Sequence, residues 1–255
     1  MGSPPEGTLV EKIIMYVEES WLASPVALAS VQIFKVMKIS LLLCFVLSAI
    51  GVRDPGPWQL TPDERKFAID YLNKTRARLL KDVEGLSKAQ LNFRPDDTSW
   101  SVAQCVEHIT LSEDLVKQWI QGGLQQPAAP QRKSEEKYTP ETLIAIVTNR
   151  SQNRAKTGGP WIPDGQFPTT ADAIRVFVSR RDSTIAYVKS TQDDLKDHFI
   201  DHPQWGALDL YEAFVMLSAH CERHTEQLEE VMTNPNFPKH TVISGFSPYL
   251  YNCAR

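Results

Sequence analysis

The stretch LDLYEAFVMLSAHCERHTEQLEEVM, Leu208 to Met232, decides the fold class of the chain. Its apolar side chains recur every three or four residues, which is the period of an amphipathic helix. The side chains predicted to share one face are those of Ala213, Phe214, Leu217, His220, His224 and Leu228. An apolar face of this length has to be covered by other helices. The stretch therefore predicts a long core helix with two histidines on its inner side.

Three further segments repeat this period. They cover residues 61–85, 101–121 and 170–190. The first opens on Thr61, Pro62 and Glu64, a capping box with proline at the first helical position. The Gly122-Gly123 pair is expected to stop the second segment. Because no segment shows the sustained alternation of a strand, we predict an all-α four-helix bundle.

An extra helix is expected between the second and third core helices. Residues 123–168 are rich in proline, but Thr139-Pro140-Glu141 opens another helix near 139–151. The long connection also permits the second and third core helices to run parallel instead of in a simple up-and-down order.

The N-terminal part of the chain has the features of a secretory signal. Residues 37–51, MKISLLLCFVLSAIG, contain a lysine, a short apolar run and a small-x-small ending. We therefore predict an exported protein, periplasmic or secreted, with a membrane anchor as the alternative. Residues 1–36 are interpreted as a misassigned or disordered extension, 52–60 as a linker, 61–233 as the bundle and 234–255 as an extended tail.

The charge and the cysteine spacing argue against nucleic-acid binding, a zinc ribbon and a thioredoxin-like motif. The net charge is −4 and no basic stripe is present, so we expect no nucleic-acid partner. The cysteines, Cys44, Cys105, Cys221 and Cys253, form no CxxC pair, which argues against a zinc ribbon or a thioredoxin-like motif. For Cys105 and Cys221 we expect small buried side chains, and export would allow a disulfide between them.

The most informative polar residues are two histidines of the last helix. His220 and His224 lie one turn apart, so both imidazoles can face one ion. On the inner side of a bundle they need a partner, and a divalent metal accepts neutral imidazole. An open metal site usually takes three protein ligands, and His108 of the second core helix is the best third candidate. A buried histidine bonded to a carbonyl is the alternative for His108, and Cys105 is left open as ligand, thiol or filler.

A second histidine pair is set aside. His198 and His202 are also four apart, but His202 precedes Pro203, which disfavours the helical conformation. The residues around them are polar. We therefore interpret this segment as a solvated helix end.

The carboxylates near the histidines give no clear general base. Glu222 is turned away from the pair, so the base of a zincin motif is missing. Glu107 is rotated about 100° from its neighbour His108. Glu113 is the remaining alternative.

Two segments resemble the DinB-like superfamily. SWSVAQCVEHI, Ser99 to Ile109, is similar to its Trp-Ser start and mid-helix histidine, and AHCERH, Ala219 to His224, to the His-x-x-x-His of its last core helix. DHFIDHPQWGALDLYEAF, residues 197–214, is also similar to members of this group. The resemblance covers residues 61–238. It implies a four-helix bundle with a left-handed crossover and a zinc or nickel ion held by His108, His220 and His224.

The resemblance implies two chemistries, metal-dependent hydrolysis and thiol-dependent transfer or isomerisation. Low-molecular-weight thiols belong mainly to the cytosol, so the predicted export favours a hydrolase that activates water. A thiol transferase and a non-catalytic, metal-stabilised bundle remain as alternatives. We expect an unidentified small-molecule substrate and leave a homodimer open.

Three larger side chains are expected near the site. Trp100 and Trp119 are predicted to lie in the core or at the entrance. Arg223 either binds an anionic substrate at the mouth of the site or lies on a solvated helix face.

Overall fold

The structure, a computed structural model, describes residues 56, 58–151 and 158–239. The extension predicted at 1–36, the signal predicted at 37–51 and most of the tail predicted at 234–255 lie outside the described residues. Within the described part, no helix has the length and apolar character needed to cross a membrane.

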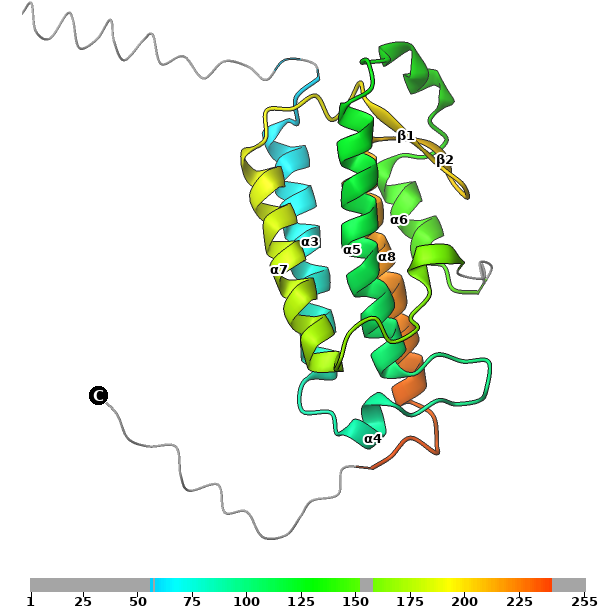
Figure 1. The fold of residues 1–255 in the computed structure, drawn as a ribbon. Coiled ribbons are helices and arrows are strands. Elements are labelled where there is room, and N and C mark those ends of the chain that lie inside the picture. Colours follow the sequence, from blue (N-terminus) through cyan, green and yellow to red (C-terminus); the bar gives the residue numbers. More distant parts are fainter. Residues whose placement is uncertain (1–55, 57, 152–157, 240–255) are drawn as a thin grey trace, which may run out of the picture. The chain divides into compact units, whose positions relative to one another are not determined.

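Four long helices form a bundle, as predicted. They are α3 (Pro62–Val83), α5 (Val102–Leu124), α7 (Thr170–Ser190) and α8 (Leu210–Met232). Each begins at a residue whose side chain caps the first turn, and in α3, α5 and α8 a reciprocal capping box completes the cap. The short helix α4 (Lys88–Leu91) lies between α3 and α5 in the chain (Figure 1).

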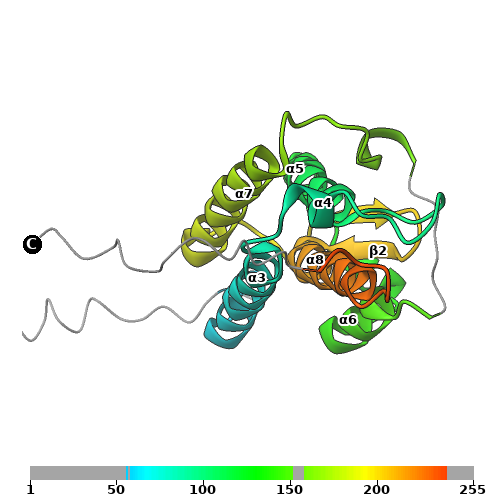
Figure 2. The ribbon, with the colours of Figure 1, turned by 90° about the horizontal axis from the view of Figure 1, so that it is seen from below.

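The helices run parallel in two of the neighbouring pairs. Followed by colour, α3 and α8 run in one direction and α5 and α7 in the other (Figure 1). Both α7 and α8 pack against α3 and against α5, so α3 and α5 lie diagonally opposite (Figure 2). The long connection therefore joins two parallel helices, α5 and α7, which an up-and-down bundle would not contain.

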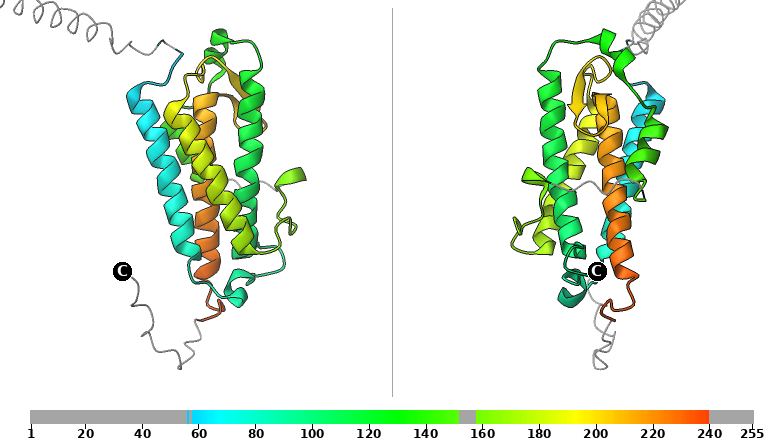
Figure 3. Two further views of the ribbon diagram at one scale, coloured as in Figure 1. Left: turned by 60° about the vertical axis from the view of Figure 1, so that its left-hand side comes forward. Right: turned by 90° about the vertical axis from the view of Figure 1, so that its right-hand side faces the viewer.

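The connection from α5 to α7 carries the predicted extra helix. It contains η1 (Pro130–Glu135), α6 (Pro140–Thr148) and η2 (Gly159–Trp161). The N-cap of α6 is Thr139, followed by proline at the first helical position. Leu143 and Val147 of α6 are buried in the core cluster that includes residues of α8. Figure 3 shows α6 beside α8, outside the four core helices.

The segment before α8 is not a helix end, and that prediction is wrong. Residues 199–209 form an antiparallel hairpin of β1 (Phe199–His202) and β2 (Gly206–Asp209). Pro203 prevents helical continuation, and Gly206 takes a φ of 82°, which favours glycine. Because β2 occupies residues up to Asp209, α8 starts at Leu210, two residues later than predicted.

A buried polar layer separates two apolar clusters of the core. The first cluster includes Leu72, Val116, Val188 and Leu217, and the second includes Leu79, Ile109, Phe177 and Leu228. Between them along the helices lie Thr75, Glu113 and Arg181, all buried.

Arg181 is the centre of this layer. Its Nε and Nη2 atoms donate to the carboxylate of Glu113 on α5. Its Nη1 donates to the carbonyl oxygen of Leu72 at 3.0 Å and to Oγ1 of Thr75 at 2.7 Å, both on α3. Arg181 and Glu113 have no exposed side-chain surface, and their hydrogen bonds compensate the cost of burying two charges.

Gly122 and Gly123 do not stop α5, which continues to Leu124. A Cβ on Gly122 would meet nothing within 4 Å. A Cβ on Gly123 would lie 2.8 Å from Cδ2 of Leu210 and 3.2 Å from the carbonyl oxygen of Phe199. Gly123 therefore permits the close approach of α5 to β1 and to the start of α8.

Substitution by alanine should change the free energy of unfolding in opposite directions at Gly122 and Gly123. Gly122→Ala should raise the free energy of unfolding by about 0.5–1 kcal/mol, because alanine favours the helix and the space is open. Gly123→Ala should lower it by about 1–3 kcal/mol, because the new methyl group overlaps its neighbours. Urea denaturation of both variants tests this, and equal effects at the two positions would contradict the packing role of Gly123.

Candidate metal centre

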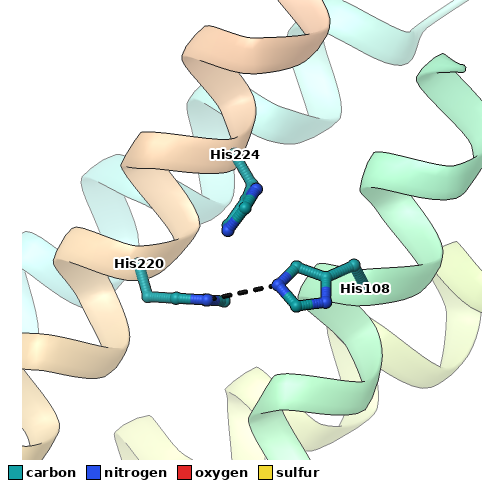
Figure 4. A group of neighbouring side chains, drawn as sticks. All are labelled: His108, His220 and His224. Atoms are coloured by element: carbon teal, nitrogen blue, oxygen red, sulfur yellow. Dashed lines mark hydrogen bonds between the residues drawn. The ribbon is translucent and has the colours of Figure 1, made fainter. Parts of the chain in front are cut away.

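Three histidines meet between α5 and α8. His108 lies in the middle of α5, and His220 and His224 lie one turn apart in α8. Their ring nitrogens form one group, so the structure brings together the three residues singled out in the sequence. Figure 4 shows the side chains of the two helices pointing toward one another.

The ring nitrogens are close enough to share one ion. Nε2 of His108 lies 3.2 Å from Nε2 of His220, and one ring nitrogen of each histidine lies within 4.8 Å of the others. Two nitrogens bound to the same tetrahedral zinc ion at about 2 Å would be about 3.3 Å apart. The arrangement therefore suits a divalent metal without a large rearrangement.

Two of the rings are oriented by hydrogen bonds on their Nδ1 side. Nδ1 of His108 lies 2.7 Å from the carbonyl oxygen of Trp161, and Nδ1 of His224 lies 2.8 Å from Oε1 of Gln227. Because these oxygens only accept, both Nδ1 atoms carry the proton and both Nε2 atoms keep their lone pairs. Outer partners of this kind orient histidines that bind metals.

Burial keeps the three imidazoles neutral. Burial lowers the pKa of His108 to about 4, although its bond to Trp161 opposes the shift. The pKa values of His220 and His224 are also well below 6.5, first because of burial and then because of the neighbouring imidazoles. At neutral pH the group therefore offers lone pairs and not positive charge.

The histidines line a pocket with aromatic walls, about 1130 Å³ in volume. The ring of Trp100 lies 4.8 Å from the ring of His108, and Trp119 and Trp161 meet edge to face at 5.1 Å. These three tryptophans line the pocket together with Trp205. Trp100 and Trp119 are partly buried and pack against the core clusters, which is one of the two predicted positions. The aromatic walls suit an organic molecule.

Arg223, which lies between His220 and His224 in the sequence, also lines the pocket. Its Nη1 donates to the carbonyl oxygens of Val147 at 3.0 Å and Asn149 at 2.9 Å. These carbonyls belong to the end of α6, where backbone acceptors lack helical partners. The alternative of a solvated helix face is therefore wrong for Arg223, and anion binding by it stays a prediction.

Among the described residues, no carboxylate joins the histidine group. Glu107 accepts from the backbone N–H groups of residues 165 and 166 at 2.9 and 2.6 Å. Glu222 accepts from the hydroxyl of Tyr71 at 2.6 Å, which agrees with its predicted direction away from the histidines. Glu113 is bound to Arg181 in the core, so its candidacy as a general base was wrong.

A group of three carboxylates lies near the start of α8, and its members are bound to a lysine and to the helix cap. It consists of Glu136, Asp209 and Glu212. Nζ of Lys133 lies 2.8 Å from Asp209 and 3.1 Å from Glu136. Asp209 and Glu212 also form the capping box of α8, and burial raises the pKa of Glu212 to about 8. The lysine and the cap account for this cluster.

Cys105 and Cys221 are buried free thiols, so the disulfide left open between them is not formed. Cys105 packs in the second apolar cluster, and burial raises its pKa to about 12. It belongs to neither the histidine group nor the pocket lining. Cys105 is therefore a small core side chain, as expected by default, and not a ligand.

Three contributors to the site were not predicted. Gln227 lies one turn after His224 on the same helix, so its spacing could have indicated it. Trp161 acts through its backbone carbonyl, which has no signal in the sequence. His202 was set aside, but it lines the pocket from the hairpin.

Comparison with known proteins identifies the family. The model of the DinB superfamily matches residues 71–228, and the chain therefore belongs to this superfamily. The uncharacterized protein YuaE of Bacillus subtilis (strain 168) is 21% identical over 163 residues, which cover 64% of this chain and 96% of YuaE. A solved structure described as "YfiT from Bacillus subtilis is a probable metal-dependent hydrolase with an unusual four-helix bundle topology" aligns with 72% of this chain and 94% of its own, at 18% identity and a TM-score of 0.47.

The hydrogen bonds of the histidines predict their tautomers. In metal-free protein at pH 7, His108 and His224 should both be neutral with the proton on Nδ1, because a carbonyl oxygen accepts from each. Long-range ¹H–¹⁵N NMR spectra distinguish this form from the Nε2-protonated one. An Nε2 proton on His108 would contradict the bond to Trp161.

Proposed function

We propose that the protein is an enzyme in which His108, His220 and His224 hold one divalent ion, zinc or nickel, for the hydrolysis of a small-molecule substrate. The observation that carries the proposal is the convergence of three neutral imidazoles on the wall of a pocket. When bound, such an ion polarises a carbonyl oxygen and lowers the pKa of water.

The donor set supports an open site. Imidazole is a common ligand of zinc and nickel, and three protein ligands are typical of catalytic zinc. In the described part of the chain, neither a thiol nor a carboxylate joins the three histidines. A fourth protein ligand would have favoured the non-catalytic alternative, and the pocket beside the group favours an enzyme.

The remaining residues of the site orient the histidine rings and cover them. Trp161 and Gln227 hold two rings with their Nε2 lone pairs exposed to one point. Trp100 covers the rings of His108 and His224 at 4.8 and 5.9 Å. Trp100 therefore covers one side of the histidine group, and it can contact the apolar part of a substrate.

Metal content is the first measurement. Protein purified without a histidine tag should bind about one zinc or nickel ion per chain, and a His220→Ala/His224→Ala variant should bind none, because one imidazole cannot hold the ion. Mass spectrometry of the metal and circular dichroism of both proteins test this. A correctly folded wild type that stays empty after zinc and nickel are added would rule out the metal centre.

Gln227, which accepts a hydrogen bond from His224, should strengthen the binding of zinc. Gln227→Met keeps the size of the side chain but removes the acceptor for Nδ1, and it should weaken zinc binding by about 10–100-fold. Gln227→Glu retains an acceptor and should keep most of the affinity. Competition with a coloured chelator measures both. Equal affinity in wild type and Gln227→Met would show that the bond does not orient the ligand.

The reaction class needs a separate assay. Metal-loaded wild type should hydrolyse members of a panel of small esters and amides, and the double histidine variant should not. Conjugation of glutathione or cysteine to an electrophilic dye, without any hydrolysis, would instead identify the thiol transferase alternative. The predicted export, which favours hydrolysis, is tested by N-terminal sequencing of the mature protein.

A further inference from the structure

His202 occupies a position in the pocket wall that no part of the proposed metal centre explains. It is the last residue of β1 and is half-buried. Its ring stacks on the ring of Trp205 at 4.1 Å with an interplanar angle of 20°. The ring of Trp119 meets it at 5.6 Å in a T-shaped contact. Both tryptophans line the same pocket, so the imidazole is held between rigid aromatic neighbours.

The hairpin turn fixes the proton on one nitrogen of this ring. Nδ1 of His202 accepts from the backbone N–H groups of Gln204 at 3.1 Å and Trp205 at 3.3 Å. A nitrogen that accepts carries no proton, so the neutral ring is protonated on Nε2. This tautomer is the opposite of the one held by His108 and His224.

The Nε2–H group of His202 is left as a donor. Its Nε2 atom makes no hydrogen bond to any residue that the structure describes, although the side chain lines the pocket. The neighbouring indole N–H of Trp205 is buried and also lacks a partner among the described residues. A buried donor such as this indole N–H is normally paired, because an unmade hydrogen bond is costly. The side chain of His202 lines the pocket, so its Nε2–H is the group available to an acceptor oxygen there.

The corner is continuous with the histidine group. Trp119 contacts both His202 and Trp161, and the carbonyl oxygen of Trp161 holds Nδ1 of His108. One aromatic wall thus connects the candidate metal ligands with the donor on the hairpin.

We propose that His202 is a specificity-determining residue, whose Nε2–H donates a hydrogen bond to an acceptor oxygen of the substrate while the tryptophan wall contacts its apolar part. The substrate class is a small organic molecule with a carbonyl or carboxylate oxygen beside an apolar or planar group. This inference rests on the proposed metal centre, which is needed to place the reacting end of the substrate.

The tautomer provides a test that needs neither metal nor substrate. The long-range ¹H–¹⁵N spectrum should show neutral His202 with its proton on Nε2. A proton on Nδ1 would overturn the inference, because the ring would then present an acceptor to the pocket.

Ligand binding tests the donor itself. Acetohydroxamate, a metal-chelating probe with acceptor oxygens, is titrated by calorimetry into zinc-loaded protein. His202→Asn keeps an oxygen that can accept from the turn, but it withdraws the donor. It should weaken acetohydroxamate binding by about tenfold or more, the effect of one hydrogen bond to a charged group. His202→Gln places an amide N–H near the lost Nε2 and should recover part of the affinity.

Two controls separate a specific effect from a general one. Imidazole binds a metal through nitrogen and offers no acceptor oxygen, so its affinity should be unchanged in His202→Asn. His198→Asn removes a histidine that bonds to the carbonyl oxygen of Gly123 at 3.1 Å, outside the pocket lining, and should leave both probes unaffected. Zinc affinity and thermal unfolding are measured for every variant.

The outcomes distinguish this inference from the proposed function. Failure of folded wild type to bind zinc or nickel would overturn the metal centre and the inference together. Normal zinc binding with equal acetohydroxamate affinity in wild type and His202→Asn would overturn the inference alone. If His202→Asn does not fold, the tautomer of His202 in the wild type decides: a proton on Nε2 supports the inference, and a proton on Nδ1 overturns it.

Discussion

The buried contact between Arg181 and Glu113 is the constraint on which the rest of the bundle depends. A guanidinium and a carboxylate without exposed surface are tolerated only if nearly every polar atom finds a partner. Arg181 therefore binds Glu113 on α5 and Leu72 and Thr75 on α3. Apolar side chains alone would pack in several rotations of a helix about its axis. This polar layer selects the one in which three helices present their polar groups to the same point.

The rotation of α5 set by this layer also determines the direction of His108. Glu113 lies five residues after His108, about 140° further round the helix. When Glu113 faces Arg181, His108 is directed toward α8, where it meets His220. The crossover segment then completes the site from outside the bundle. It supplies the carbonyl of Trp161 to His108, and the end of α6 binds Arg223 between the two histidines of α8. The extra helix is thus a part of the site, although it lies outside the four-helix core.

The sequence predicted those features whose signals are local. Thr61 and Thr139 begin helices because cap, proline and helical period lie within a few residues. The spacing of four between His220 and His224 places them on one face of any helix. Other features depend on residues far away in the chain. Gly123 resembles a helix stop until Leu210 is seen to pack against it. His202 resembles a solvated residue until Trp205 of its own hairpin and Trp119 of α5 enclose it. Short strands carry little periodic signal, so the hairpin itself was not predicted.

The parallel crossover also has a consequence for the order in which the molecule forms. The bond between His108 and Trp161 joins residues 53 apart in the chain, and the contact between His108 and His220 joins residues 112 apart. Closing such loops costs entropy before any contact is gained, and non-local pairings slow folding. During synthesis, α8 emerges after the other helices, so two of the three imidazoles arrive last. We therefore expect the histidine cluster to form late in folding, after the helices that carry it have packed.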